Sequence, residues 1–197
     1  MKKLLLSIAV AWLALGLTGC ASIYVDTATK EVSASTFKKT ASPKPVQFIF
    51  DFQTKGVANA TATKYLSEQV TAQIKESGLF SSVQSEPVAD GGLLSLVINN
   101  VPLTEDAAGK GFVTGLTFGL AGSQVTDGYI CTVKYLPSAQ GAPISKTARH
   151  AIHTVLGAKE DPPNATKAES IEAAVRTMTR QIISNVLNDL SQDTGFQ

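Results

Sequence analysis

The feature that most constrains the fold is a long amphipathic segment near the C-terminus. Its apolar residues recur at helical spacing along one side: Ile171, Val175, Met178, Ile182, Val186 and Leu190. This stripe predicts a helix with one buried face. Thr166 and Glu169 form a capping-box pattern that places its start just after Pro162-Pro163. A long helix with a single apolar face needs a sheet to cover, so strands are expected earlier in the chain.

Five segments have the composition and spacing of strands, at residues 46–52, 80–86, 93–101, 129–136 and 144–155. The first alternates most clearly, with Val46, Phe48, Phe50 and Phe52 on one face. The last two are expected to form a hairpin. A second helix is predicted over residues 61–77, where Ala62, Leu66, Val70 and Ile74 recur every four residues. Gly78 ends this helix. We therefore predict an α+β fold: a mostly antiparallel four- to five-stranded sheet with two helices on one face.

The N-terminus has the pattern of an export signal. Two lysines precede a stretch without charge from Leu4 to Leu17, and this stretch ends in Leu17-Thr18-Gly19-Cys20. A cationic head followed by a short apolar core is typical of a secretory signal peptide. The core is shorter than the roughly 20 apolar residues that a helix needs to cross a bilayer.

Leu17-Thr18-Gly19-Cys20 resembles the lipobox of bacterial lipoproteins. The resemblance implies that residues 1–19 are a signal peptide and that the Cys20 thiol takes diacylglycerol. Cys20 then becomes the first residue of the mature chain and carries several acyl chains, palmitate among them, which anchor firmly. Ala21 follows in place of the Asp that tends to retain such proteins in the inner membrane. The resemblance therefore implies an outer-membrane lipoprotein facing the periplasm.

The mature chain is expected to hold one domain behind a tether. Residues 20–45 are rich in Ala, Ser, Thr and Lys and end in Pro43-Lys44-Pro45, so we predict a flexible tether with at most a short strand at Ile23–Val25. Residues 46–197 then form a single periplasmic α+β domain. Their element order loosely resembles small accessory lipoproteins of outer-membrane and peptidoglycan assembly machines. No motif accompanies this second resemblance, so it implies no site residue.

Charge and cysteine content exclude some classes of function. The full chain has 17 basic and 16 acidic residues, and loss of Lys2 and Lys3 with the signal peptide leaves 15 against 16. A nucleic-acid surface would be strongly basic, so no nucleic-acid partner is expected. Cys20 is consumed by lipid, and Cys131 lies in a predicted strand as a small buried apolar residue. No intramolecular disulfide is expected.

The segment 107–127 is the least ordinary part of the sequence. It is glycine-rich and carries no charge between Lys110 and Asp127. The residues singled out for interaction are Gly111, Phe112, Gly115, Leu116, Phe118, Gly119 and Leu120. Three interpretations stay open. The segment is a surface loop, a contact for a partner or for a second copy, or an element that enters a membrane.

No motif of catalysis or metal binding was found in the sequence. His150 and His153 lie three apart on a predicted strand and point to opposite faces, so they cannot hold one metal together. The Gly-Lys-Gly at 109–111 lacks the other residues of a phosphate loop, and no GxSxG elbow is present. We expect no catalytic residue, cofactor or metal.

These features predict a membrane-anchored, non-enzymatic binding or assembly module of the cell envelope. Its partners would be the membrane, through the N-terminal lipid, and an envelope protein or a second copy of the chain. The alternative is a self-assembling structural or pore-forming lipoprotein that uses the 107–127 segment. An envelope hydrolase is a third possibility, and it requires a catalytic pair that the sequence does not reveal.

Overall fold

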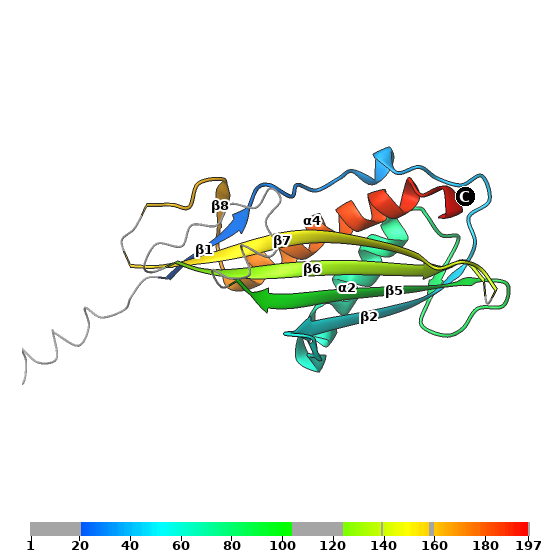
Figure 1. Ribbon diagram of the computed structural model, residues 1–197, viewed down its shortest axis with the longest axis horizontal. Helices are drawn as coiled ribbons and strands as arrows, with labels where there is room; N and C mark the ends of the chain where they lie inside the picture. Colours follow the sequence, from blue (N-terminus) through cyan, green and yellow to red (C-terminus); the bar gives the residue numbers. More distant parts are fainter. Residues whose placement is uncertain (1–20, 104–123, 139, 158–159, 197) are drawn as a thin grey trace, which may run out of the picture.

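The computed structural model describes residues 21–103, 124–138, 140–157 and 160–196 (Figure 1). An eight-stranded sheet runs through them, with neighbouring strands in the order β3-β2-β5-β6-β7-β1-β8 and β4 paired to β2. The strands are β1 Ala21–Asp26, β2 Val46–Thr54, β3 Val57–Ala58, β4 Val83–Gln84, β5 Gly92–Pro102, β6 Gln124–Leu136, β7 Ile144–Leu156 and β8 Ala165–Ala168. Pairing is antiparallel except for β2 with β5 and with β4. The α+β class is therefore confirmed.

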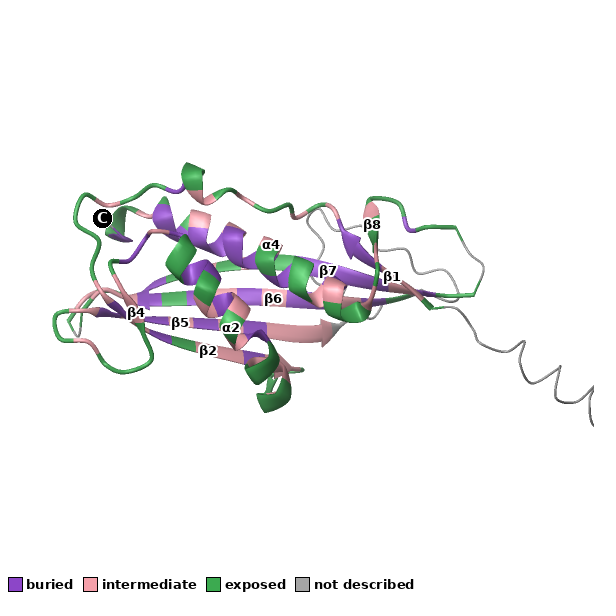
Figure 2. Cartoon of the chain, turned by 180° about the vertical axis from the view of Figure 1, so that it is seen from behind, coloured by how far each residue is buried: buried purple, intermediate pink, exposed green. Residues whose placement is uncertain are grey.

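Two helices cover one face of the sheet. These are α2, Ala60–Glu76, and α4, Ile171–Ser191, with short 3-10 turns η1 (Ala34–Thr36) and η3 (Thr194–Phe196). Figure 2 shows both helices in front of the strands, and Figure 1 shows the opposite face with no helix over it. The core lies between the helices and β2, β5, β6 and β7. Its fully buried residues include Leu66, Ile74, Leu96, Ile98 and Ile182.

Local sequence explains where the helices begin and end. Asn59 caps α2 by accepting a hydrogen bond from the Ala62 amide, and Ser170 caps α4 by accepting one from the Ala173 amide. After α2, Gly78 takes a φ of +65°, a left-handed conformation that glycine adopts without strain. Leu79 follows at 1% exposure, which anchors the end of the helix to the core.

The strand count predicted from the sequence was too low. The five predicted strands are present, although the one expected at residues 80–86 shortens to Val83–Gln84. Two more, β3 and β8, lie at the edges of the sheet, and the short strand expected at Ile23–Val25 is present as β1 between β7 and β8. They are short, and β3 and β8 have no apolar alternation because they lie at the edges. The prediction of a capping box at Thr166 and Glu169 was also wrong. β8 occupies residues 165–168, and Ser170 caps α4 instead.

The flexible tether expected over residues 20–45 is not what the structure has. The chain enters the sheet at Ala21 and then runs along α4 (Figure 1). Phe37 is buried in the core, and the amides of Val32 and Lys38 donate to Ser184 and Ser191 of α4. Apolar and hydrogen-bonding contacts therefore hold this segment against the domain. Its Ala, Ser and Thr content resembled a linker, but small polar residues also suit a segment packed along a helix.

Candidate functional site

The strand that follows Cys20, the residue where lipidation is expected, is an internal strand of the sheet. β1 begins at Ala21, one residue after Cys20, and lies between β7 and β8. Ala21 to Val25 pair with Leu156 to Ile152, and Ile23 to Asp26 pair with Ala168 to Ala165. Pairing on both sides from Ile23 to Val25 makes β1 an integral part of the sheet, so an anchor at Cys20 is connected directly to the sheet.

Buried polar contacts fix β1 in this place. The Asp26 carboxylate lies 3.3 Å from His153 Nε2 and accepts a hydrogen bond from the Ala28 amide at 2.7 Å. His153 Nδ1 lies 3.0 Å from the Thr126 hydroxyl of β6. Tyr24 donates its hydroxyl proton to Asp161 in the segment before β8, and this bond raises the pKa of Tyr24. The strand is thereby joined to β6, β7 and the connection to β8.

Asp26, His153 and Thr126 are the residue types of an acid, a base and a nucleophile in one line. The Asp26 and His153 side chains are 0% and 1% exposed, and Thr126 is 4% exposed. A nucleophile has to reach its substrate, and Thr126 as a whole has almost no accessible surface. The arrangement therefore acts as a buried hydrogen-bonded connection between three strands, which specifies their register.

His150 lies on the other face of β7, as its spacing from His153 predicted. The Ala151 amide donates to His150 Nδ1 at 2.8 Å, so the neutral ring carries its proton on Nε2 and donates it to Gln181 of α4 at 2.7 Å. Burial lowers the pKa of His150. The two histidines are thus used separately to join the sheet to α4 and to β1.

Metal-ligating side chains do not cluster in the described ranges. No group of three or more His, Cys, Asp or Glu side chains in these ranges could hold a metal ion. Cys131 is fully buried in β6, and burial raises the pKa of its thiol. In these same ranges no helix combines the length and the apolar character that crossing a membrane requires.

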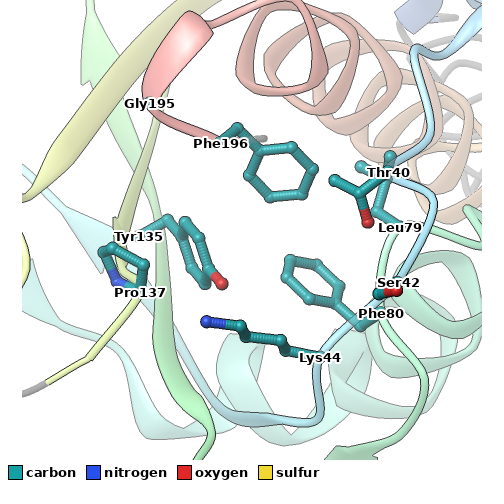
Figure 3. A pocket seen from close by; sticks show the side chains of 9 residues that line it. All are labelled: Thr40, Ser42, Lys44, Leu79, Phe80, Tyr135, Pro137, Gly195 and Phe196. Atoms are coloured by element: carbon teal, nitrogen blue, oxygen red, sulfur yellow. The ribbon is translucent and has the colours of Figure 1, made fainter.

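A small aromatic pocket lies between the end of α2, β6 and η3. Figure 3 shows Phe80, Tyr135 and Phe196 turned toward one another around it, with ring centroids 5.2–5.8 Å apart. The Thr40 hydroxyl beside them is buried, with no hydrogen-bond partner in the described part of the chain. The cavity of about 60 Å³ has room for a few water molecules. It is well below the roughly 300 Å³ of a small-molecule site, so the pocket is a packing feature.

The larger candidate surface is the bare sheet face, meaning the side of β2, β5, β6 and β7 turned away from the helices. Register places Ile49, Ser95, Lys134 and Ser145 in one row and Asp51, Val97, Thr132 and Thr147 in the next. A third row holds Gln53, Asn99, Ile130 and Arg149. Aliphatic and uncharged polar side chains predominate. Ile49, at 46% exposure, is the most exposed large apolar side chain of these rows.

The residues singled out from the sequence lie outside the described residues. This holds for Cys20 and for the segment residues from Gly111 to Leu120. The sequence did not reveal the contacts among Asp26, Thr126 and His153, which are up to 127 residues apart. The tentative strand at Ile23–Val25 was the only signal for them, and it did not indicate the partners of that strand.

The comparisons with known proteins find likeness in structure only. No family model matches the chain, and no curated protein matches it. Rare lipoprotein B from Shewanella oneidensis is 13% identical, with a TM-score of 0.36 over 75% of this chain and 94% of its own. A minor lipoprotein from Acinetobacter baumannii is 14% identical, with a TM-score of 0.29 over 79% and 90%. A PelC dodecamer from Paraburkholderia phytofirmans is 13% identical, with a TM-score of 0.34 over 87% and 98%.

Two of these three structures are named as lipoproteins. At these identities and TM-scores the likeness does not extend to a partner, an activity or one of the two membranes.

Proposed function

We propose that this chain is a lipid-anchored module of the cell envelope that binds another envelope protein and performs no chemistry of its own. The observation that carries the proposal is the bare sheet face, which stands on a domain whose first strand begins one residue after the lipidation position. The anchor supplies location and the sheet supplies a fixed surface. The position of Ala21 after Cys20 supports the outer membrane, with the domain on the periplasmic side.

The shape of the bare sheet face suits a protein better than a small molecule. Small-molecule sites are concave, whereas this face is an open sheet surface. Ile49, Val97 and Ile130 interrupt a face on which antiparallel sheets usually carry polar residues. With Asp51 and Arg149 at opposite sides, the charges are few and of both signs. A second sheet surface or a helix could cover these side chains without burying many charges.

The size of this face indicates a contact that is weak in solution. Four strands at about 4.8 Å spacing and five residues at about 3.3 Å give a face of roughly 300 Å². This is less than half of the roughly 800 Å² that each partner contributes to a standard interface. Two proteins held on one membrane meet at a high effective concentration, which compensates for a small contact. The lipid anchor is therefore part of the binding mechanism.

The experiment is chemical cross-linking of the full-length, lipidated protein in intact membranes, followed by extraction in mild detergent and measurement of its mass by size exclusion with light scattering. Cross-linking comes first because the shared membrane supplies the effective concentration. We expect a particle heavier than one subunit with its detergent. Ile49→Lys should reduce that particle several-fold, because it places a charge in the contact. Ile171→Lys is the matched control, since Ile171 is 45% exposed at the start of α4, on the covered side of the sheet.

The composition of the particle identifies the partner. A second protein in it supports the accessory module, and a homogeneous multiple of the subunit supports self-assembly. A mass of one subunit, or equal loss of the particle in both variants, would contradict the proposed use of the bare sheet face.

A further inference from the structure

One end of the sheet combines the anchored strand with exposed apolar side chains. Ala21 pairs with Leu156 at the last position of β7, and Val125 pairs with Thr154 two residues before it. Val125 and Leu156 therefore lie on the same face of neighbouring strands, one position apart along the diagonal. They are 52% and 48% exposed, among the most exposed large apolar residues in the described ranges.

The lipid-attachment position lies next to this end. Successive Cα atoms are about 3.8 Å apart, so the Cα atom of Cys20 is about 3.8 Å from that of Ala21. Ala21 in turn pairs with Leu156. The acyl chains on Cys20 have to enter the bilayer, because each buried methylene contributes about 0.8 kcal/mol. A long tether would separate the domain from the membrane, but here the strand begins at once.

β1 is also held too firmly to act as a flexible linker between the lipid and the domain. It is paired with β7 from Ala21 and with β8 from Ile23, and Tyr24, Val25 and Asp26 are 3%, 5% and 0% exposed. Pulling β1 out of the sheet would expose these side chains and separate Asp26 from His153. The sheet therefore follows the lipid anchor without an intervening hinge.

We infer that the end of the sheet carrying Val125 and Leu156 rests on the bilayer surface, with both side chains in contact with lipid. The inference depends on lipidation at Cys20, which is part of the proposed function. The contact is apolar, so it is directed at the boundary between headgroups and acyl chains. Amphipathic surfaces that bind membranes by charge use Lys and Arg, which neither position provides.

The same geometry raises the bare sheet face away from the membrane. Ser145, in the row of Ile49, lies eleven residues before Leu156 along β7. At about 3.3 Å per residue this places the row roughly 36 Å from the lipid-facing end. A partner standing on the same membrane could reach the face from the side. Ile49 thus becomes the natural negative control for lipid contact.

The chain offers a simple probe, because its single tryptophan is Trp12 in the signal peptide. After cleavage before Cys20 the mature protein has none. Val125→Trp, Leu156→Trp and Ile49→Trp each introduce one indole at a position of similar exposure. Each full-length lipidated variant is reconstituted into phosphatidylethanolamine–phosphatidylglycerol vesicles, with and without phosphatidylcholine that carries a nitroxide on its headgroup. Mass spectrometry of the N-terminal peptide verifies the lipid.

We expect several-fold stronger quenching of Trp at 125 and 156 than at 49, unchanged by added salt. Circular dichroism spectra and unfolding midpoints that match those of the unsubstituted protein show that each variant is folded. If only one of the variants at 125 and 156 folds, its quenching alone tests the inference. Equal quenching at all three positions, or none at 125 and 156 in verified lipidated protein, would overturn the inference while leaving the binding proposal intact. A Cys20 without lipid would overturn both.

Discussion

Replacing Asp26 by alanine distinguishes a structured N-terminal strand from a tether. The substitution removes the acceptor of the Ala28 amide and the carboxylate beside His153 Nε2. A buried donor left without its acceptor costs about 1–3 kcal/mol, so the two together predict a loss of about 2–6 kcal/mol of unfolding free energy. A domain of this size has a total of about 5–15 kcal/mol, so the loss is easily measured.

The assay is urea unfolding of lipid-free protein starting at Ala21, followed by far-ultraviolet circular dichroism. Glu31→Ala is the matched control. It removes a carboxylate from the same N-terminal region, where Glu31 pairs with Arg180 at 2.7 Å but both side chains are about half exposed. Exposed pairs contribute about 0–1 kcal/mol, so this variant should remain close to wild type.

Asp26→Asn is the intermediate case. The amide oxygen can still accept from the Ala28 amide, and a tautomer change in His153 can restore its contact, so the loss should be smaller than for alanine. If Asp26→Ala unfolds within about 0.5 kcal/mol of Glu31→Ala, the buried connection contributes nothing and our account of β1 is wrong.

Four further predictions concern the rest of the domain. Ser170→Ala should lower the free energy of unfolding in urea by about 0.5–2 kcal/mol, because it removes the cap of α4. Ile182→Ala should lower it by about 2–5 kcal/mol, because it leaves a cavity in the core. A loss near zero in either variant would contradict the corresponding prediction. Cys131 should resist a thiol reagent in the folded protein and react fully in urea, because burial raises its pKa, whereas fast reaction when folded would show an open sheet. Burial lowers the pKa of His150 below its unfolded value near 6.5, so stability should fall as pH drops below about 6.5; His150→Gln should flatten this part of the profile, and an unchanged slope would refute the assignment.

The central part of the fold could be predicted because its patterns are strong. Phe48 and Phe52 alternate along β2, and Leu66, Val70 and Ile74 repeat along α2, so their buried faces could be identified without tertiary information. Cys131 was correctly expected to be buried. In a long helix or strand with one apolar face, the spacing of the apolar residues shows which face is buried in the core.

The edges of the sheet could not be predicted, because their structure depends on distant partners. β8 reads Ala-Thr-Lys-Ala and has no pattern of its own, and it becomes a strand only beside β1. Ser170 caps α4 because β8 occupies the positions of the expected capping box. The contact of Asp26 with His153 requires the register of β1 on β7, which local sequence does not contain.

The most direct test of the account is amide hydrogen exchange over residues 21–26 in the lipidated protein on vesicles. We predict that the amides of Ile23 to Asp26 exchange as slowly as those of β6 and β7, because β1 is hydrogen-bonded within the sheet. Such protection would show that the lipid anchor continues directly into the fold. Exchange at the rate of an unfolded chain would show a tether, and it would contradict both the rigid anchor and the membrane-facing end derived from it.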